Sequence, residues 1–288
     1  MAIIRNPIEW SVAQVGGATR HIIAIAQSLA GGEEKNLSKL PAVNHIQLQD
    51  IRDAISKGFA DFSACRTDVL ALSVIYPVAG LALWWFVSSN KLLPLLFPLV
   101  SGFALLGPVA AVGLYEMSRQ RELGKTVSWA NAFDVVRSPA FGAIFVLGLV
   151  MLAIFLLWLA AAQAIYMTFL GPEPPSSAAA FITQVFNTSA GQTMAIVGIC
   201  VGLLFAVLVL SISVVSFPML LDQNIGLIAA VVTSVRALFA NPIPIAVWGM
   251  IVAAGLLVGS IPLFLGLIVV VPVLGHATWH LYRKVVAR

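Results

Sequence analysis

The sequence predicts an all-α polytopic membrane protein, a helical bundle of six transmembrane helices with amphipathic interfacial helices. Of its 288 residues, 60% are hydrophobic and 10% are charged, whereas soluble domains average about 45–50% apolar and a quarter charged residues. Several apolar stretches also reach the roughly 20 residues that a helix needs to cross about 30 Å of hydrocarbon. This composition excludes a soluble globular protein, and it is the opposite of a disordered one.

Three regions follow one another along the chain. Residues 1–47 are predicted to form a cytoplasmic N-terminal segment, residues 48–66 an interfacial amphipathic helix, and residues 67–288 the six-helix transmembrane domain. Apolar side chains recur from Ile8 to Leu29 at alternating spacings of four and three, which is typical of an amphipathic helix. That helix is expected to lie on the membrane surface or against the spans, with a partner's helix as the alternative, and a polar linker follows it.

The interfacial helix is predicted from about Asp50 to Ala64. Its charged side chains, Asp61 among them, are expected on other faces than its apolar ones, so that the helix lies in the interface plane and leads into the first span. The expected apolar face consists of Ile51, Ile55, Phe59 and Phe62.

The spans are the apolar segments of sufficient length. The last apolar block, about 245–282, is too long for one span and contains Gly259-Ser260-Ile261-Pro262, a Gly/Pro break that favours two helices. One long kinked helix, and therefore five spans, is the alternative. The six predicted spans cover about 69–88, 92–115, 139–170, 193–221, 245–260 and 263–282.

The basic residues set the orientation, because cytoplasmic flanks of spans are enriched in Lys and Arg. With six spans and the N-terminus inside, only Lys91 of the 16 basic residues lies outside. A five-span model would move Arg283, Lys284 and Arg288 outside, so the charges favour six spans with both termini cytoplasmic. The net charge of +4 then reflects orientation and attraction to anionic membrane lipids, and no nucleic-acid partner is expected.

A weak internal repeat links the two halves of the transmembrane domain. The second and fourth predicted spans are each followed by a short cytoplasmic helix, about 128–137 and 225–239. Ser138-Pro139 then opens the third span and Asn241-Pro242 the fifth. Both units enter from the same side, which indicates parallel copies.

Four ionisable residues form a candidate polar cluster at the cytoplasmic helix ends: Glu116, Asp222, His276 and His280. The two histidines are four residues apart and share a helix face, as a two-histidine metal site requires. However, Trp279, Tyr282 and Arg283 surround them, which is typical of an interfacial anchor belt. Anchoring or hydrogen bonding is therefore expected, and no catalytic, cofactor-binding or metal-binding residue is predicted.

The predicted spans carry almost no ionisable residue near their middle, where such groups mark ion or proton pathways. This pattern favours a non-enzymatic accessory or scaffold protein over an ion-coupled transporter. Prolines within the spans, such as Pro98, Pro108 and Pro218, leave a passive channel or transporter for an unknown solute as the alternative.

Six segments carry distinctive strings of residues: Ser63–Val69, Ile75–Pro77, Leu93–Leu99, Gly113–Arg119, Ser128–Ala130 and Gly275–Arg283. They resemble an uncharacterised bacterial integral-membrane family, domain-of-unknown-function family 2189. The resemblance covers roughly residues 48 to 285 and implies a bacterial inner-membrane protein, without supplying an activity. Some proteins that the chain resembles are described as cytochrome c oxidase subunit I, but haem–copper chemistry needs about six histidines on several spans, and association with a respiratory complex is the most that is expected.

Overall fold

The computed structural model describes residues 40–64, 73–89 and 92–287. Within these ranges the chain is helical, and the only β-pairing is an isolated antiparallel bridge between Val43 and Val286. The all-α helical prediction is therefore confirmed. The N-terminal helix predicted over about 8–29, and the start of the first predicted span, lie outside the described residues.

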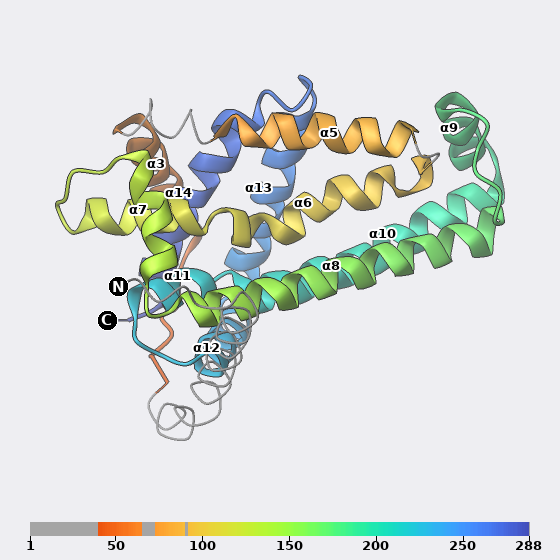
Figure 1. The fold of residues 1–288 in the computed structure, drawn as a ribbon. Coiled ribbons are helices and arrows are strands. Elements are labelled where there is room, and N and C mark those ends of the chain that lie inside the picture. The colour runs from red at the N-terminus through yellow and green to blue at the C-terminus, as the bar shows by residue number, and fades with distance from the viewer. Residues whose placement is uncertain (1–39, 65–72, 90–91, 288) are drawn as a thin grey trace, which may run out of the picture.

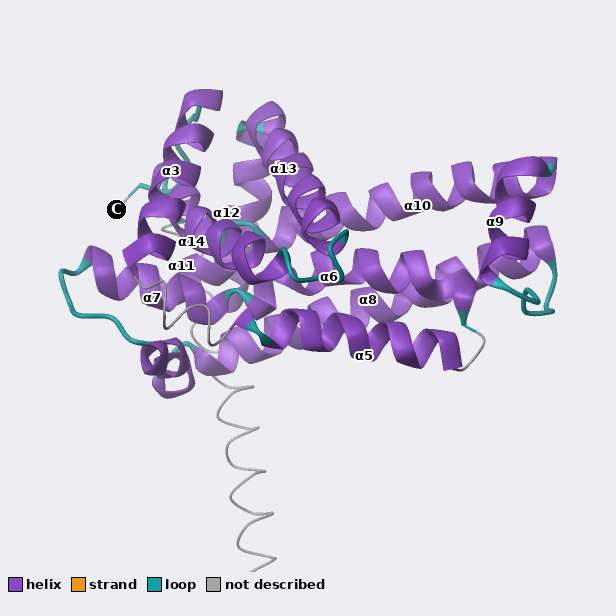
Figure 2. Ribbon diagram, turned by 90° about the horizontal axis from the view of Figure 1, so that it is seen from above, coloured by secondary structure: helices purple, strands orange, loops and turns teal. Residues whose placement is uncertain are grey.

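The longest feature is an antiparallel pair of helices, α8 (Phe141–Leu170) and α10 (Ser189–Ser213). They run side by side away from the rest of the protein and are joined at their far end by α9 (Ala178–Asn187), as Figures 1 and 2 both show. Gly171 ends α8 with a φ of 86°, a conformation that favours glycine. The Thr188 hydroxyl caps α10 by accepting a hydrogen bond from the Gly191 amide at 3.0 Å, which satisfies one free N–H group of the first turn.

Of three shorter elements, η1 (Leu93–Leu95) and α6 (Leu96–Ala110) lie beside this pair, and α5 (Ile75–Ser89) lies next to α6. The predicted second span is not one continuous helix, because α6 ends at Ala110 and α7 (Val112–Glu122) begins after Ala111. Pro108 lies three residues before the break, and a proline inside a helix removes a backbone hydrogen bond and clashes with the preceding turn. The predicted fourth span divides in the same way.

That second division separates α10 from α11 (Ser216–Asp222). Pro218 lacks the N–H group that would bond to the Val214 carbonyl four residues earlier, so the regular ladder is lost at this point. After the first break, α7 is followed by the short helix η2 (Trp129–Arg137). After the second break, α11 is followed by α12 (Leu227–Ala240). The element order expected for the internal repeat is therefore present in both halves.

The last apolar block forms two helices, α13 (Pro242–Ser260) and α14 (Leu267–Val285), as predicted. The turn between them places Leu263 and Phe264 at φ values of 53° and 65°. It also brings Gly266 so close to Gly259 that a Cβ atom on Gly266 would lie 2.7 Å from the Gly259 Cα. Figures 1 and 2 show α13 running across the α8–α10 pair instead of along it.

Three described segments are long and apolar enough to cross a membrane: Phe141–Leu170, Ser189–Asp222 and Pro242–Ser260. Shorter apolar helices cover 75–87, 93–102, 178–187 and 227–240. Since α14 is not among the three, six remains a predicted number of spans. Only 28%, 6% and 17% of the most apolar windows of these segments are buried within the protein, as expected of helices that face lipid or other proteins.

Helix α3 (Leu48–Ala64) packs along α14, and their contact forms the end of the molecule opposite α9 (Figure 1). The buried stripe of α3 differs from the expected one. Phe59 is exposed, whereas Asp61, which was expected on another face, is buried. The stripe runs through Ile51, Ala54, Gly58, Asp61 and Phe62.

Candidate functional site: a buried carboxylate between three helices

The Asp61 carboxylate from α3 lies where α3, α7 and α14 meet. Its Oδ2 accepts hydrogen bonds from Ser118 Oγ at 2.6 Å and from His280 Nε2 at 2.9 Å. Its Oδ1 accepts one from the Arg121 guanidinium at 2.6 Å. Because the single Ser118 proton goes to Asp61, the 2.8 Å contact between Ser118 Oγ and His276 Nδ1 has the histidine as donor. One carboxylate thus connects four side chains on two other helices.

These five side chains, Asp61, Ser118, Arg121, His276 and His280, form the Asp61 network, which is enclosed on nearly all sides. Ser118 and His276 are each 1% exposed and Asp61 is 7% exposed. Arg121 connects the Asp61 network to the surface, since 37% of its side chain is accessible to solvent. A buried carboxylate is stable only when paired and hydrogen-bonded, and the three donors to Asp61 meet that requirement.

The surroundings of Asp61 change its acidity. Burial by itself raises the pKa of the carboxyl, but the hydrogen bonds from His280 and Ser118, together with the positive potential of His280 and His276, outweigh burial. The net result is a pKa below the ordinary value of 3.8. The folded protein therefore holds Asp61 in its ionised form more strongly than the unfolded chain does.

This lowered pKa predicts that α3 docking weakens in acid. Because the unfolded chain binds the Asp61 proton more tightly, the stabilisation is present above pH 3.8 and is lost as the pH falls through the lower, folded pKa. Pepsin cleavage of α3 between about pH 4.5 and 2 measures this loss. Wild type is expected to approach the fast cleavage rate of Asp61→Asn as the pH falls, and a constant ratio between the two rates would contradict the prediction.

Lys284 makes a second, more exposed connection between α14 and α3. Its ammonium group lies 2.9 Å from Asp50 Oδ1 and 3.4 Å from Asp53 Oδ2. The hydrogen bond to Asp50 raises the pKa of Lys284. The pKa of Asp50 is lowered, first by the hydrogen bond from the Gln47 amide and then by Lys284. Since all three side chains reach water, this pair contributes little to stability.

Glu116 and Asp222 lie in separate clusters. Glu116 is 2% exposed and pairs with Arg119 of its own helix through two 2.8 Å hydrogen bonds, which raise the pKa of Arg119. Asp222 Oδ2 accepts a hydrogen bond from the Tyr282 hydroxyl at 2.8 Å and from Arg283 at 2.9 Å. Arg283 also reaches Glu122 at 3.2 Å, which connects α7, α11 and α14.

The structure therefore brings His276 and His280 together through Asp61, but does not join them to Glu116 or Asp222. Sequence reasoning missed Asp61, Ser118 and Arg121. The spacing of Asp61 from Ile51, Ala54 and Gly58, by ten, seven and three residues, is the signal that would have placed it on the buried face. Among the described residues, no three His, Cys, Asp or Glu side chains are grouped so that they could hold a metal ion.

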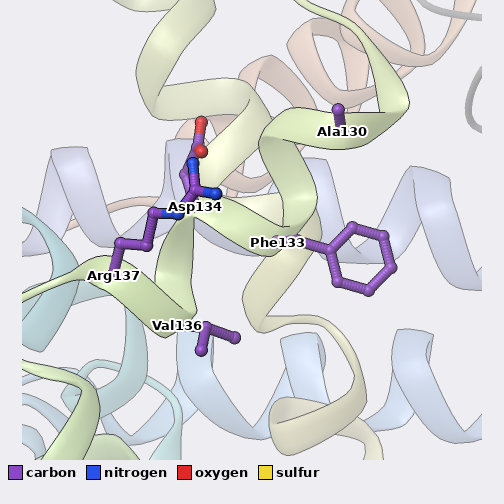
Figure 3. Close-up of a pocket in the computed structure, with 5 residues that line it drawn as sticks. All are labelled: Ala130, Phe133, Asp134, Val136 and Arg137. Atoms are coloured by element: carbon purple, nitrogen blue, oxygen red, sulfur yellow. The ribbon is translucent and has the colours of Figure 1, made fainter. Parts of the chain in front are cut away.

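A shallow hollow of about 420 Å³ lies over η2 and is shown in Figure 3. Its lining comes from one element only: Ala130, Phe133, Asp134, Val136 and Arg137. The Asp134 carboxylate accepts a 2.8 Å hydrogen bond from Asn131 of the same helix. Phe133 points away from Asp134 and Arg137 in Figure 3. With no side chain from a second element, the hollow does not assemble a catalytic pair.

Comparison with known proteins supports the membrane location that the apolar helices indicate. A family model described as a predicted integral membrane protein (DUF2189) matches residues 96–222, the stretch from the start of α6 to the end of α11. No curated protein and no solved structure matches the chain. The family indicated by the sequence motifs is confirmed over this shorter range. Residues 96–222 of the chain are thus similar to the DUF2189 family, and the match supports an integral membrane location.

Proposed function

We propose that this chain is a non-enzymatic accessory or scaffold protein, which uses its long apolar helices to hold other proteins in the membrane. The observation that carries the proposal is the exposure of α10. Only 6% of the most apolar window of Ser189–Asp222 is buried within the chain. Ile199, Leu203 and Leu204 are 62%, 62% and 70% exposed. A surface of this size is available to a partner's helix.

The chemistry of the long helices supports holding over transport. Neither α8 nor α10 contains an Asp, Glu, Lys, Arg or His residue, and ion-coupled transport normally requires such groups within the membrane. The charged groups that the structure describes near α14 are engaged in ion pairs, as for Arg283 with Asp222 and Lys284 with Asp50. These ion pairs connect the helices around α14 at one end of the protein, and the apolar helices remain available for contacts with other molecules.

The contact between the two ends of the described chain supports an even number of spans. The Ala287 amide donates to the Ala42 carbonyl at 3.1 Å, and the Asn44 amide donates to the Val285 carbonyl at 2.8 Å. This contact supports placing the segment before α3 and the end of α14 on the same side of the membrane. Five spans would separate them, so the contact favours the six-span arrangement with both ends in the cytoplasm, as the basic residues predict for a bacterial inner membrane.

Photo-crosslinking in native membranes tests the scaffold proposal. A photoreactive amino acid at Leu204, which is 70% exposed, is expected to give a protein adduct of discrete mass. The same probe at Val209, which is 4% exposed on the same helix, is the matched control and is expected to give at least about tenfold less protein adduct, because a side chain enclosed by its own fold does not reach a partner protein.

Two results would contradict the scaffold proposal. One is that Leu204, together with exposed positions on other helices such as Leu157 and Leu257, yields only lipid adducts. The other is that a cysteine placed at Pro108 reacts readily with a membrane-impermeant maleimide. Water at that depth would favour the alternative, a passive channel or transporter. A respiratory or other membrane complex would be identified by the mass of the Leu204 adduct.

A further inference from the structure

A cavity of about 430 Å³ lies between α6, α10, α13 and α14. Its volume falls in the range of about 300–1,000 Å³ that is usual for small-molecule sites, and its lining is apolar apart from a few hydroxyl groups, as such sites usually are. The hydroxyls belong to Tyr115, Ser213 and Thr278. Its rim includes Leu203 and Met250, each 62% exposed, so the cavity opens towards the apolar surface of the helices.

Ser213 is the one hydroxyl in the cavity that lacks a partner among the described residues. It is 1% exposed. Thr278 donates to the Leu274 carbonyl at 2.7 Å, and Tyr115 is hydrogen-bonded with Thr278. The nearby hydroxyls of Ser211 and Ser216 donate to carbonyls of the preceding turn, but Ser213 does not. A buried hydroxyl without a hydrogen-bond partner destabilises the protein, and a ligand with an acceptor atom would supply the missing hydrogen bond.

Water is a poor occupant of this cavity. A buried water normally needs two to four polar partners, and apolar cavities remain dry. Among the described lining residues, Ser213 offers the one free hydroxyl donor, because Thr278 donates to Leu274 and Tyr115 is hydrogen-bonded with Thr278, and the rest of the lining is apolar. A ligand that brings one acceptor and a long apolar remainder fits this lining better. Leu203 and Ser213 both line the cavity, and ten residues of helix α10 span about 15 Å, which matches an elongated ligand.

We propose that this cavity binds an acyl chain of a membrane phospholipid, with its ester carbonyl accepting a hydrogen bond from Ser213 Oγ. The chain enters from the membrane between Leu203 and Met250, where the rim is exposed. The carbonyl lies at the Ser213 end, close to Tyr115 and thus to the charged residue Glu116 that follows it. This orientation places the ester at the polar end of the cavity and the hydrocarbon against its apolar lining.

Delipidated, purified protein labelled with a photoreactive phospholipid tests the hydrogen bond. The probe carries a diazirine in its acyl chain and is used as a matched pair, one lipid with an ester linkage and one with an ether linkage that lacks the carbonyl. Wild type is expected to bind the ester lipid about three- to tenfold more tightly than the ether lipid, the range for one hydrogen bond. Ser213→Ala is expected to abolish that preference, whereas Ser211→Ala, whose hydroxyl bonds to Leu208, keeps it.

A second pair of variants tests the cavity itself. A side chain at Gly107 would enter open space in the cavity, because a Cβ atom there meets nothing within 4 Å. Gly107→Leu is therefore expected to reduce labelling of the segments around Leu203 and Met250 at least about fivefold. Gly198→Leu, on α10 at an equally open position that does not line the cavity, is expected to leave it unchanged. Equal labelling in both variants, or equal binding of ester and ether lipids by wild type, would overturn the proposal.

Discussion

Replacing Asp61 by asparagine is expected to release α3 from α7 and α14 and to lower the free energy of unfolding by about 3–5 kcal/mol, the usual cost of breaking a buried ion pair from one side. The carboxylate accepts from Ser118, Arg121 and His280 in a site where it is 7% exposed. Asparagine has the same shape, but its amide has one acceptor oxygen and no charge. Whichever way the amide is turned, its NH2 group then faces a donor, either Arg121 or the pair Ser118 and His280.

Trypsin measures this release, because Arg52 and Lys57 lie on α3 and are cleaved only when the helix opens. Cleavage of Asp61→Asn is expected to be at least about tenfold faster than cleavage of wild type. Lys284→Ala is the control, because it removes ion pairs to Asp50 and Asp53 whose side chains reach water, and exposed pairs are worth only about 0–1 kcal/mol. If both variants were cleaved at the same rate, the Asp61 network would not be what holds α3.

The sequence predicted the features that depend on one helix at a time. Apolar runs predicted helices over about 139–170 and 193–221, which correspond to α8 and to α10 with α11, and the Gly/Pro content of 259–262 predicted the division between α13 and α14. The repeat of short helices after the second and fourth apolar segments was also visible. These properties follow from hydrophobicity, helix length and chain breakers, which are local quantities.

The features that depend on two or more helices were not predictable. Asp61 was expected on a solvated face because it is charged, yet three donors from α7 and α14 make its burial favourable. The donors are 57, 60 and 219 residues away in sequence, so no local pattern reveals them. His276 and His280 were correctly grouped by their spacing, but the carboxylate to which they are connected, directly for His280 and through Ser118 for His276, is Asp61 and not Glu116 or Asp222.

The breaks at Ala111 and at Val214-Val215 form a third case. Proline residues near both positions were noted in the sequence, but a proline within an apolar helix either bends the helix or ends it. Here the chain turns into α7 and α11, which contact each other and carry Ser118, Arg121 and Asp222 towards α14. Packing of these short helices decides the outcome, and that information lies outside any single segment.

Gly58→Leu is expected to prevent α3 from docking on α14 altogether. A Cβ atom at Gly58 would lie 2.7 Å from the Ala277 amide nitrogen, 2.8 Å from the Ala277 Cβ and 2.8 Å from the Val273 carbonyl oxygen. Two of these atoms are backbone and cannot move without displacing α14. Overpacking a close contact costs about 1–3 kcal/mol even for small additions, so a leucine is expected to cost at least as much as Asp61→Asn.

Gly198→Leu provides the matched comparison, because it is the same substitution inside a helix where a Cβ atom meets nothing within 4 Å. Leucine has a higher helix propensity than glycine by about 0.5–1 kcal/mol, so this variant is expected to unfold at an equal or slightly higher temperature than wild type. Gly58→Leu is expected to show rapid tryptic cleavage at Arg52 and Lys57 together with a lower unfolding temperature. If Gly58→Leu instead behaved like Gly198→Leu, α3 and α14 would not approach each other this closely, and the buried position of Asp61 would no longer follow, because the same contact places its carboxylate beside His280.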